Sequence, residues 1–154
     1  SLGQISEALF ILLLPVLLKR FGIKTTLVVG MIAWVSRYIL FAYGDVGGGI
    51  WMLILGVILH GICYDFFFVS GQIYTDFKAG VQFKSSAQGL ITLATYGLGM
   101  LVGFRVAGKI TDLYSIGSSH DWTQIWIIPS GFAFIVLIFF ILTFQDEKIK
   151  LENE

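Results

Sequence analysis

Long apolar stretches alternate with short polar connections along the whole chain. A membrane-spanning helix needs about 20 mostly apolar residues, because ~30 Å of hydrocarbon is crossed at ~1.5 Å per residue. Five stretches meet this requirement, at about residues 1–18, 25–43, 50–75, 86–108 and 123–144. The pattern predicts an all-α membrane protein, a helical bundle of about five transmembrane helices over residues 1–145, with a tail at 146–154.

The composition favours a membrane protein and excludes several other classes. Of the 154 residues, 56% are hydrophobic and 13% are charged, whereas soluble domains carry about 25% charged residues. Ten Lys and Arg residues balance ten Asp and Glu residues, so the basic surface of a nucleic-acid-binding protein is absent and we expect no nucleic-acid partner. A single cysteine, Cys63, excludes a disulfide framework.

The first stretch begins at Ser1 with neither an initiator Met nor a signal peptide, so we expect a segment of a longer protein.

Lysine and arginine residues gather on one side of the predicted bundle. Cytoplasmic loops collect these residues. One side carries Lys109, with Arg105 nearby inside its helix. The other side carries Lys19, Arg20, Lys24, Lys78, Lys84, Lys148 and Lys150. This asymmetry predicts that the second side, and with it the C-terminus, is cytoplasmic.

Ionisable side chains within the apolar stretches are candidates for function, because placing them in lipid is costly. Counting helical rise from the cytoplasmic edge puts Glu7 roughly 18 Å and Asp65 roughly 16 Å into the membrane, near the midplane at ~15 Å. Gln4 and His60 fall roughly 22 and 24 Å from the same edge. Two helices therefore each place a carboxylate near the midplane and a neutral hydrogen-bonding group further out, which indicates a polar substrate site.

Helical spacing groups these side chains further. Gln4 and Glu7 are three residues apart, and His60 and Tyr64 are four apart, so each pair shares one face of its helix. Asp65 lies about 100° around the helix from Tyr64, where it can flank the same cavity or contact a neighbouring helix. The alternative is structural: Glu7 and Asp65 would be hydrogen-bonded within the bundle and never meet a substrate.

The remaining polar groups point to no catalytic or metal chemistry. Arg37 is interpreted as structural, either a fixed ion-pair partner or a group that reaches the outer interface. His60 and Asp65 are five residues apart on different faces, so they form no metal-binding pair. Gly47–Gly49 is followed by Ile50 rather than Lys, which is typical of a turn and not of a phosphate-binding loop. With no recognisable nucleophile motif, we expect neither an enzyme nor a bound cofactor or metal.

Five short motifs are more specific than the hydropathy pattern. They are Gly3-Gln4-Ile5-Ser6-Glu7, Lys19-Arg20-Phe21-Gly22-Ile23-Lys24, Arg37-Tyr38, His60-Gly61-Ile62-Cys63-Tyr64-Asp65-Phe66 and Ala87-Gln88-Gly89-Leu90-Ile91-Thr92-Leu93. Together they resemble the nucleoside permeases of the nucleoside–proton symporter family, within the major facilitator superfamily. The resemblance covers nearly the whole chain. It implies a transporter of twelve helices in two six-helix halves, of which this chain looks like the eighth to twelfth helices.

The resemblance also implies a role for each candidate residue. Gln4 and Glu7 would contact the nucleoside from one helix, and His60, Tyr64 and Asp65 would contact it from another. Either Asp65 or Glu7 would carry the coupling proton, because a carboxylate in a low-dielectric site binds a proton more readily. No cofactor beyond that proton is implied.

The same resemblance implies secondary active transport by alternating access in a bacterial cytoplasmic (inner) membrane. The expected partners are a nucleoside such as uridine, cytidine or adenosine, the lipid bilayer, and the missing N-terminal half of the same transporter. Two alternatives stay open. One is a facilitator for a sugar or another polar metabolite, and the other is a non-transporting five-helix membrane scaffold subunit.

Overall fold

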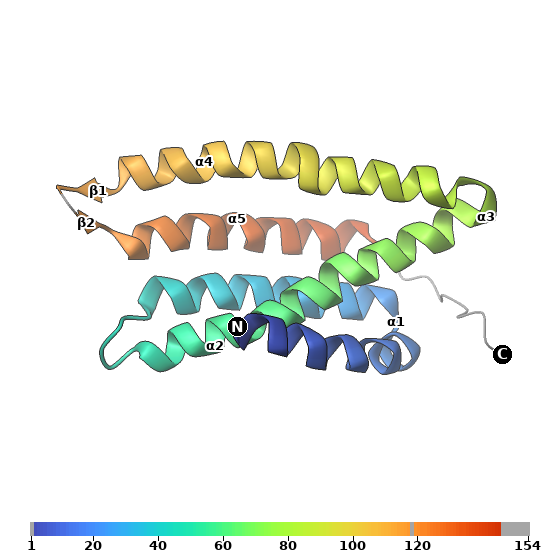
Figure 1. Ribbon diagram of the computed structural model, residues 1–154, viewed down its shortest axis with the longest axis horizontal. Helices are drawn as coiled ribbons and strands as arrows, with labels where there is room; N and C mark the ends of the chain where they lie inside the picture. The colour runs from blue at the N-terminus through green and yellow to red at the C-terminus, as the bar shows by residue number, and fades with distance from the viewer. Residues whose placement is uncertain (1, 118, 146–154) are drawn as a thin grey trace.

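The computed structural model describes residues 2–117 and 119–145, which are nearly all helical (Figure 1). The elements are α1 (Leu2–Tyr43), α2 (Ile50–Cys63), the π-helix η1 (Tyr64–Val69), α3 (Ser70–Thr92), the π-helix η2 (Leu93–Gly99), α4 (Met100–Leu113), β1 (Ser115–Ile116), β2 (Ser119–His120) and α5 (Trp122–Thr143). The predicted all-α class is therefore confirmed over these residues, apart from the short hairpin of β1 and β2.

Within the described residues, three continuous helical stretches are long and apolar enough to cross a membrane. They are Leu2–Tyr43, Ile50–Leu113 and Trp122–Thr143. The first two are much longer than one crossing requires, and each is interrupted at a single glycine, where φ is 78° at Gly22 and 65° at Gly80. Figure 1 shows that the chain folds back on itself at both places, so each stretch forms a helical hairpin.

The connections expected at about residues 19–24 and 76–86 are not loops. The helix continues up to the glycine on both sides, and Gly22 and Gly80 are the interrupting residues with non-helical angles. Glycine adopts positive φ without a Cβ clash, so one such residue is enough to end one helix and start the next. Hydropathy marks these segments as connections because their cations need water, but it does not separate a charged helix end from a loop.

Helix α5 lies along the second half of α1 and is fastened to it by side-chain hydrogen bonds to backbone carbonyls. Thr123 Oγ1 donates to the carbonyl of Ala42 at 3.0 Å, and Ser130 Oγ donates to the carbonyl of Val35 at 3.3 Å. At the other end, Lys24 Nζ donates to the carbonyl of Ile141 at 3.0 Å. A lysine near a helix C-terminus satisfies a free carbonyl and complements the helix dipole.

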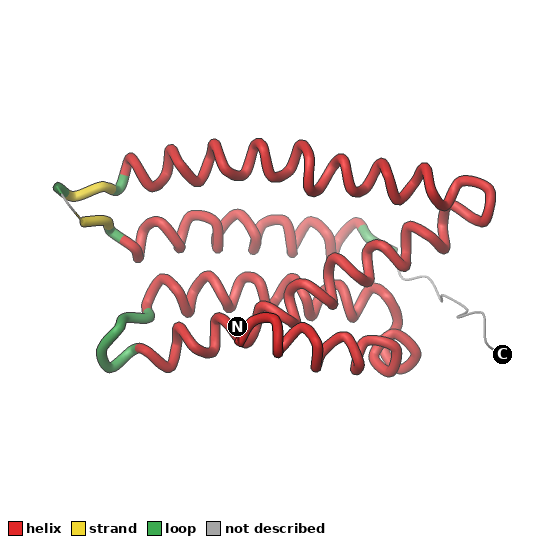
Figure 2. The backbone as a smooth tube through the Cα atoms, viewed as in Figure 1, coloured by secondary structure: helices red, strands yellow, loops and turns green. Residues whose placement is uncertain are grey.

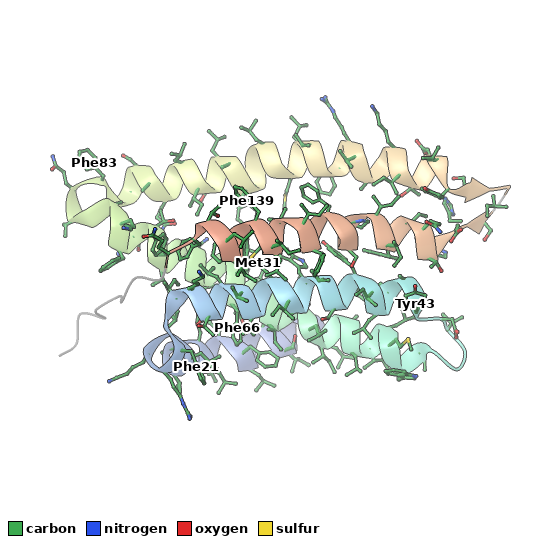
Figure 3. The ribbon with its side chains drawn as sticks, turned by 180° about the vertical axis from the view of Figure 1, so that it is seen from behind. Phe21, Met31, Tyr43, Phe66, Phe83 and Phe139 are labelled. Carbon is green, nitrogen blue, oxygen red and sulfur yellow. The ribbon has the colours of Figure 1, made fainter. Side chains whose placement is uncertain are left out.

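The bundle has a small core and an apolar exterior. Buried apolar residues such as Leu14, Ile23, Met31 and Phe66 lie between α1, α2 and η1, and Figure 3 shows Met31 and Phe66 among the helices. Many large apolar side chains point outward around the bundle (Figure 3). An exterior of this kind fits a lipid environment or a further protein surface.

The segment from Gly80 to Leu113 is the most weakly packed part of the described bundle. Figure 2 shows its helix along the upper edge of the bundle. It joins α5 through the hairpin, in which Ser115 pairs with His120 and Ile116 with Ser119. Helix α5 then begins at Trp122 and is capped by Asp121, whose Oδ1 accepts from the backbone N–H of Gln124 at 3.2 Å.

Candidate functional site

The first half of α1 crosses α2 with almost no side chain between the two backbones. A Cβ built at Gly61 would lie 2.6 Å from the backbone N of Glu7 and the carbonyl C of Ser6. The N–H of Gly61 donates to Ser6 Oγ at 3.2 Å, and that hydroxyl donates to the carbonyl of Gly3 at 2.6 Å. This close backbone contact places Glu7 next to the residue that precedes Gly61.

That neighbouring residue is His60, and it forms the centre of a row of three polar side chains. His60 Nε2 lies 2.9 Å from Glu7 Oε1, and His60 Nδ1 lies 2.7 Å from Nη1 of Arg37. The His60 and Glu7 side chains are 37% and 30% exposed, so the row is open on one side. Glu7 and Arg37 come from the two halves of α1, on either side of the reversal at Gly22.

Aromatic rings lie beside His60. The ring of Tyr64 lies 6.2 Å from that of His60, which agrees with their four-residue spacing. The hydroxyls of Tyr64 and Tyr96 are 2.7 Å apart, and Phe68 contacts both rings, with centroids 5.3 Å and 5.9 Å away. Tyr96 belongs to η2, so this cluster ties the second helical hairpin together beside the polar row.

Asp65 lies deeper in the bundle than the other candidates. Its residue surface is only 2% exposed, and its Oδ2 has no hydrogen-bond partner among the described residues. It sits in η1, where the backbones of η1 and α1 are in close contact: a Cβ at Gly30 would lie 3.0 Å from the backbone of Phe66 and Phe67. The structure therefore buries Asp65 one residue after Tyr64, outside the row that Glu7 and His60 form.

Gln4, the remaining candidate, lies on α1 one helical turn before Glu7 and is exposed. The structure thus joins Glu7, His60 and Tyr64 directly, places Gln4 next to them along α1, and sets Asp65 behind them.

Two members of this site have no substrate role predicted from the sequence. Arg37 is interpreted there as structural, and Tyr96 is one of several intramembrane polar residues that could line a cavity. A depth comparison could have found Arg37, because 13 residues of helical rise from Lys24 place it roughly 20 Å from the cytoplasmic edge, close to the level of His60. The contact between Tyr96 and Tyr64 depends on how two distant π-helices meet, and the sequence carries no signal for that.

The amino-acid sequence of this chain matches a known protein family. The profile of the family described as "Nucleoside H+ symporter" matches residues 1–149. The chain belongs to the nucleoside–H+ symporter family. The predicted resemblance is thereby confirmed, and the nucleoside–H+ symporters are membrane transporters of the major facilitator superfamily rather than enzymes.

Curated members of the nucleoside–H+ symporter family align with almost all of this chain. Nucleoside permease NupG of Escherichia coli is 35% identical over 152 residues, which are 98% of this chain and 36% of NupG. Xanthosine permease of the same organism is 37% identical over 155 residues, covering 97% of this chain and 37% of the permease. The chain therefore spans about a third of the length of these nucleoside–H+ symporters (36% and 37%).

Solved structures of the nucleoside transporter NupG share the fold. A crystal structure of a NupG point mutant superposes with a TM-score of 0.88 at 36% identity, covering 94% of this chain and 36% of that one. A second NupG crystal structure gives a TM-score of 0.86 at 35% identity. The chain is thus an all-helical, multi-pass membrane protein whose fold matches part of NupG.

Proposed function

We propose that this chain is the C-terminal part of a proton-coupled nucleoside transporter that works by alternating access. The observation that carries the proposal is the row of Glu7, His60 and Arg37, which is polar, partly exposed and set within an otherwise apolar bundle. Binding groups of membrane transporters are expected at such intramembrane positions. Membership of the nucleoside–H+ symporter family supplies the substrate class.

The chemistry of a nucleoside fits the groups at this site. Glu7 accepts hydrogen bonds from ribose hydroxyls or a base N–H, and the exposed amide of Gln4 pairs with a base edge. His60 holds Glu7 in place, and the Tyr64 ring offers a flat surface on which a base can stack. These four residues are the proposed substrate contacts.

Asp65 is proposed as the proton carrier, with Glu7 as the other candidate. A charged carboxylate without a partner is costly to bury, and Asp65 is buried with one oxygen unpaired among the described residues. Protonation removes that cost when the site is closed to water. Exposure of the carboxyl to each side of the membrane in turn then couples proton and nucleoside movement.

The two helical hairpins and α5 are proposed to make five membrane crossings, equivalent to the eighth to twelfth of twelve helices. Figure 1 supports this division, because the reversals at Gly22 and Gly80 lie at one end of the bundle and the β1–β2 hairpin at the other. The end with the reversals carries the cations of residues 19–24 and 78–84, which favours a cytoplasmic location in a bacterial inner membrane. Lys148 and Lys150, which also entered the charge count, lie outside the described residues.

The same division sets the proposed domain boundaries. Residues 1–145 form the transporter segment and 146–154 a cytoplasmic tail. The remainder of the cavity wall is assigned to the missing N-terminal half, because the matched permeases are about three times as long as this chain (36% covered).

Uptake by the full-length protein in proteoliposomes tests the proposal. With an inward proton gradient, labelled uridine should accumulate above its equilibrium level, and a protonophore should abolish this accumulation. Unlabelled cytidine and adenosine should compete, and sugars should not. Competition by sugars would favour the sugar facilitator instead, and a folded protein that transports neither class would favour a scaffold subunit.

A further inference from the structure

We propose that Arg37 is a positioning residue, which holds His60 in the neutral form with its proton on Nε2 and so directs that proton at Glu7. The inference rests on the proposed function, because it explains how the substrate-binding carboxylate is oriented. Arg37 lies 2.7 Å from His60 through Nη1, and His60 lies 2.9 Å from Glu7 through Nε2.

The direction of these two hydrogen bonds follows from the chemistry of the guanidinium group. Arginine has five N–H donors, no acceptor, and does not lose its proton in proteins. Nδ1 of His60 faces Arg37 and must therefore accept, which it can do only when it carries no proton. The single imidazole proton is then on Nε2, where Glu7 Oε1 is the acceptor. Donation runs in one direction, from Arg37 to His60 to Glu7.

The surroundings of Arg37 keep its guanidinium in this position. The group lies 5.2 Å from the ring centroid of Phe41, one turn further along α1. Its Nε is buried and has no hydrogen-bond partner within the described residues, so Nη1 to His60 is a principal polar contact. Among the described residues, the charged and titratable groups that face His60 are Arg37 and Glu7 from α1 and Tyr64 from η1.

Loss of Arg37 changes what Glu7 faces. If the proton moves to Nδ1, the lone pair of Nε2 points at the carboxylate, and two acceptors oppose each other. If the ring gains a second proton, it becomes a cation paired with Glu7 and neutralises the charge that a nucleoside hydroxyl should meet. In both cases nucleoside binding weakens, whereas a lysine at position 37 still donates to Nδ1 and keeps the neutral form.

The experiment compares Arg37→Met and Arg37→Lys in the full-length transporter. Two quantities are measured in reconstituted protein: the ¹⁵N chemical shifts of the His60 ring, identified as the signals lost in His60→Gln, and the KM for uridine. We expect wild type and Arg37→Lys to show Nε2 protonated and Nδ1 unprotonated. Arg37→Met should lose this pattern and raise KM about tenfold, the loss expected for a hydrogen bond to a charged group. Arg105→Met, which removes an exposed arginine of α4, is the matched control and should change neither quantity.

Three results would overturn the inference. One is a wild-type His60 that is protonated on Nδ1 or on both nitrogens. This measurement uses the wild-type protein alone and does not depend on whether any variant folds. The second is an unchanged ring pattern in Arg37→Met, and the third is an unchanged KM together with a changed ring pattern. The ring signals are recorded without transport, so they test the positioning role independently of the substrate. If the ring pattern depends on Arg37 but uridine is not taken up, the result counts against the proposed substrate and not against the positioning role.

Discussion

His60 donates to Glu7 at the point where α1 and α2 meet backbone to backbone. The hydrogen bond is possible because the residue after His60 is glycine: a side chain at Gly61 would push the Ser6–Glu7 backbone away. The geometry of the polar row therefore depends on a residue that carries no functional group.

Gly61→Ala should destabilise the protein and weaken substrate binding together. The new Cβ would lie 2.6 Å from the backbone of α1, which cannot move like a flexible side chain. Overpacking of this kind costs about 1–3 kcal/mol. Thermal unfolding of the full-length protein in detergent measures the first effect, and uridine binding measures the second.

Gly131→Ala is the control, because a Cβ there meets no atom within 4 Å and only helix propensity changes. Equal melting temperatures for Gly61→Ala and Gly131→Ala would contradict the close crossing.

The sequence predicted the helices and part of the site, for physical reasons that also explain what it missed. Apolar length revealed the membrane helices, and i,i+4 spacing placed His60 and Tyr64 together, because both depend on local helix geometry alone. Which face of the second half of α1 meets His60 depends on the reversal at Gly22 and on packing, so Arg37 was left out. Asp65 lies in the π-helix η1, and hydropathy carries no signal that distinguishes a π-helix from a regular α-helix.

The hydroxyls of Tyr64 and Tyr96 should act as a unit. Removing either one breaks the same 2.7 Å hydrogen bond between η1 and η2, so Tyr64→Phe and Tyr96→Phe should each lower stability by about 1 kcal/mol. The double variant should be little worse than either single variant, because the second substitution removes no further bond. A double-mutant cycle on the free energy of unfolding measures the coupling, and strictly additive losses would show that the hydroxyls do not interact.

Asp76 should make a pH-dependent contribution to the hairpin around Gly80. The hydrogen bond from Gln88 and the 2.9 Å ion pair with Lys84 hold the pKa of Asp76 below its ordinary value of 3.8. Because folding lowers this pKa, the ionised Asp76 stabilises the folded protein fully when the pH is above the ordinary pKa. This stabilisation is lost as the pH falls through the lowered pKa of the folded protein. Wild type should therefore unfold at a higher temperature than Asp76→Asn at neutral pH, and the difference should shrink as the pH falls below the ordinary pKa of 3.8.

The control for this prediction is Asp112→Asn, which changes an exposed aspartate of α4. A difference between wild type and Asp76→Asn that grows as the pH falls would contradict the sign. High salt should reduce the difference at neutral pH, because exposed ion pairs are screened.

Asp65→Asn should separate nucleoside movement from proton coupling. Asparagine has nearly the same shape and carries no charge, so the buried position is filled without a cavity or an unpaired ion. We expect the variant to fold, to exchange labelled uridine against internal uridine, and to lose accumulation driven by a pH gradient. Glu7→Gln should instead weaken uridine binding about tenfold, because the group that accepts from His60 and the substrate loses its charge. If Asp65→Asn still accumulates uridine and Glu7→Gln does not, the proton carrier is Glu7; if both variants accumulate it, neither carboxyl couples transport to protons.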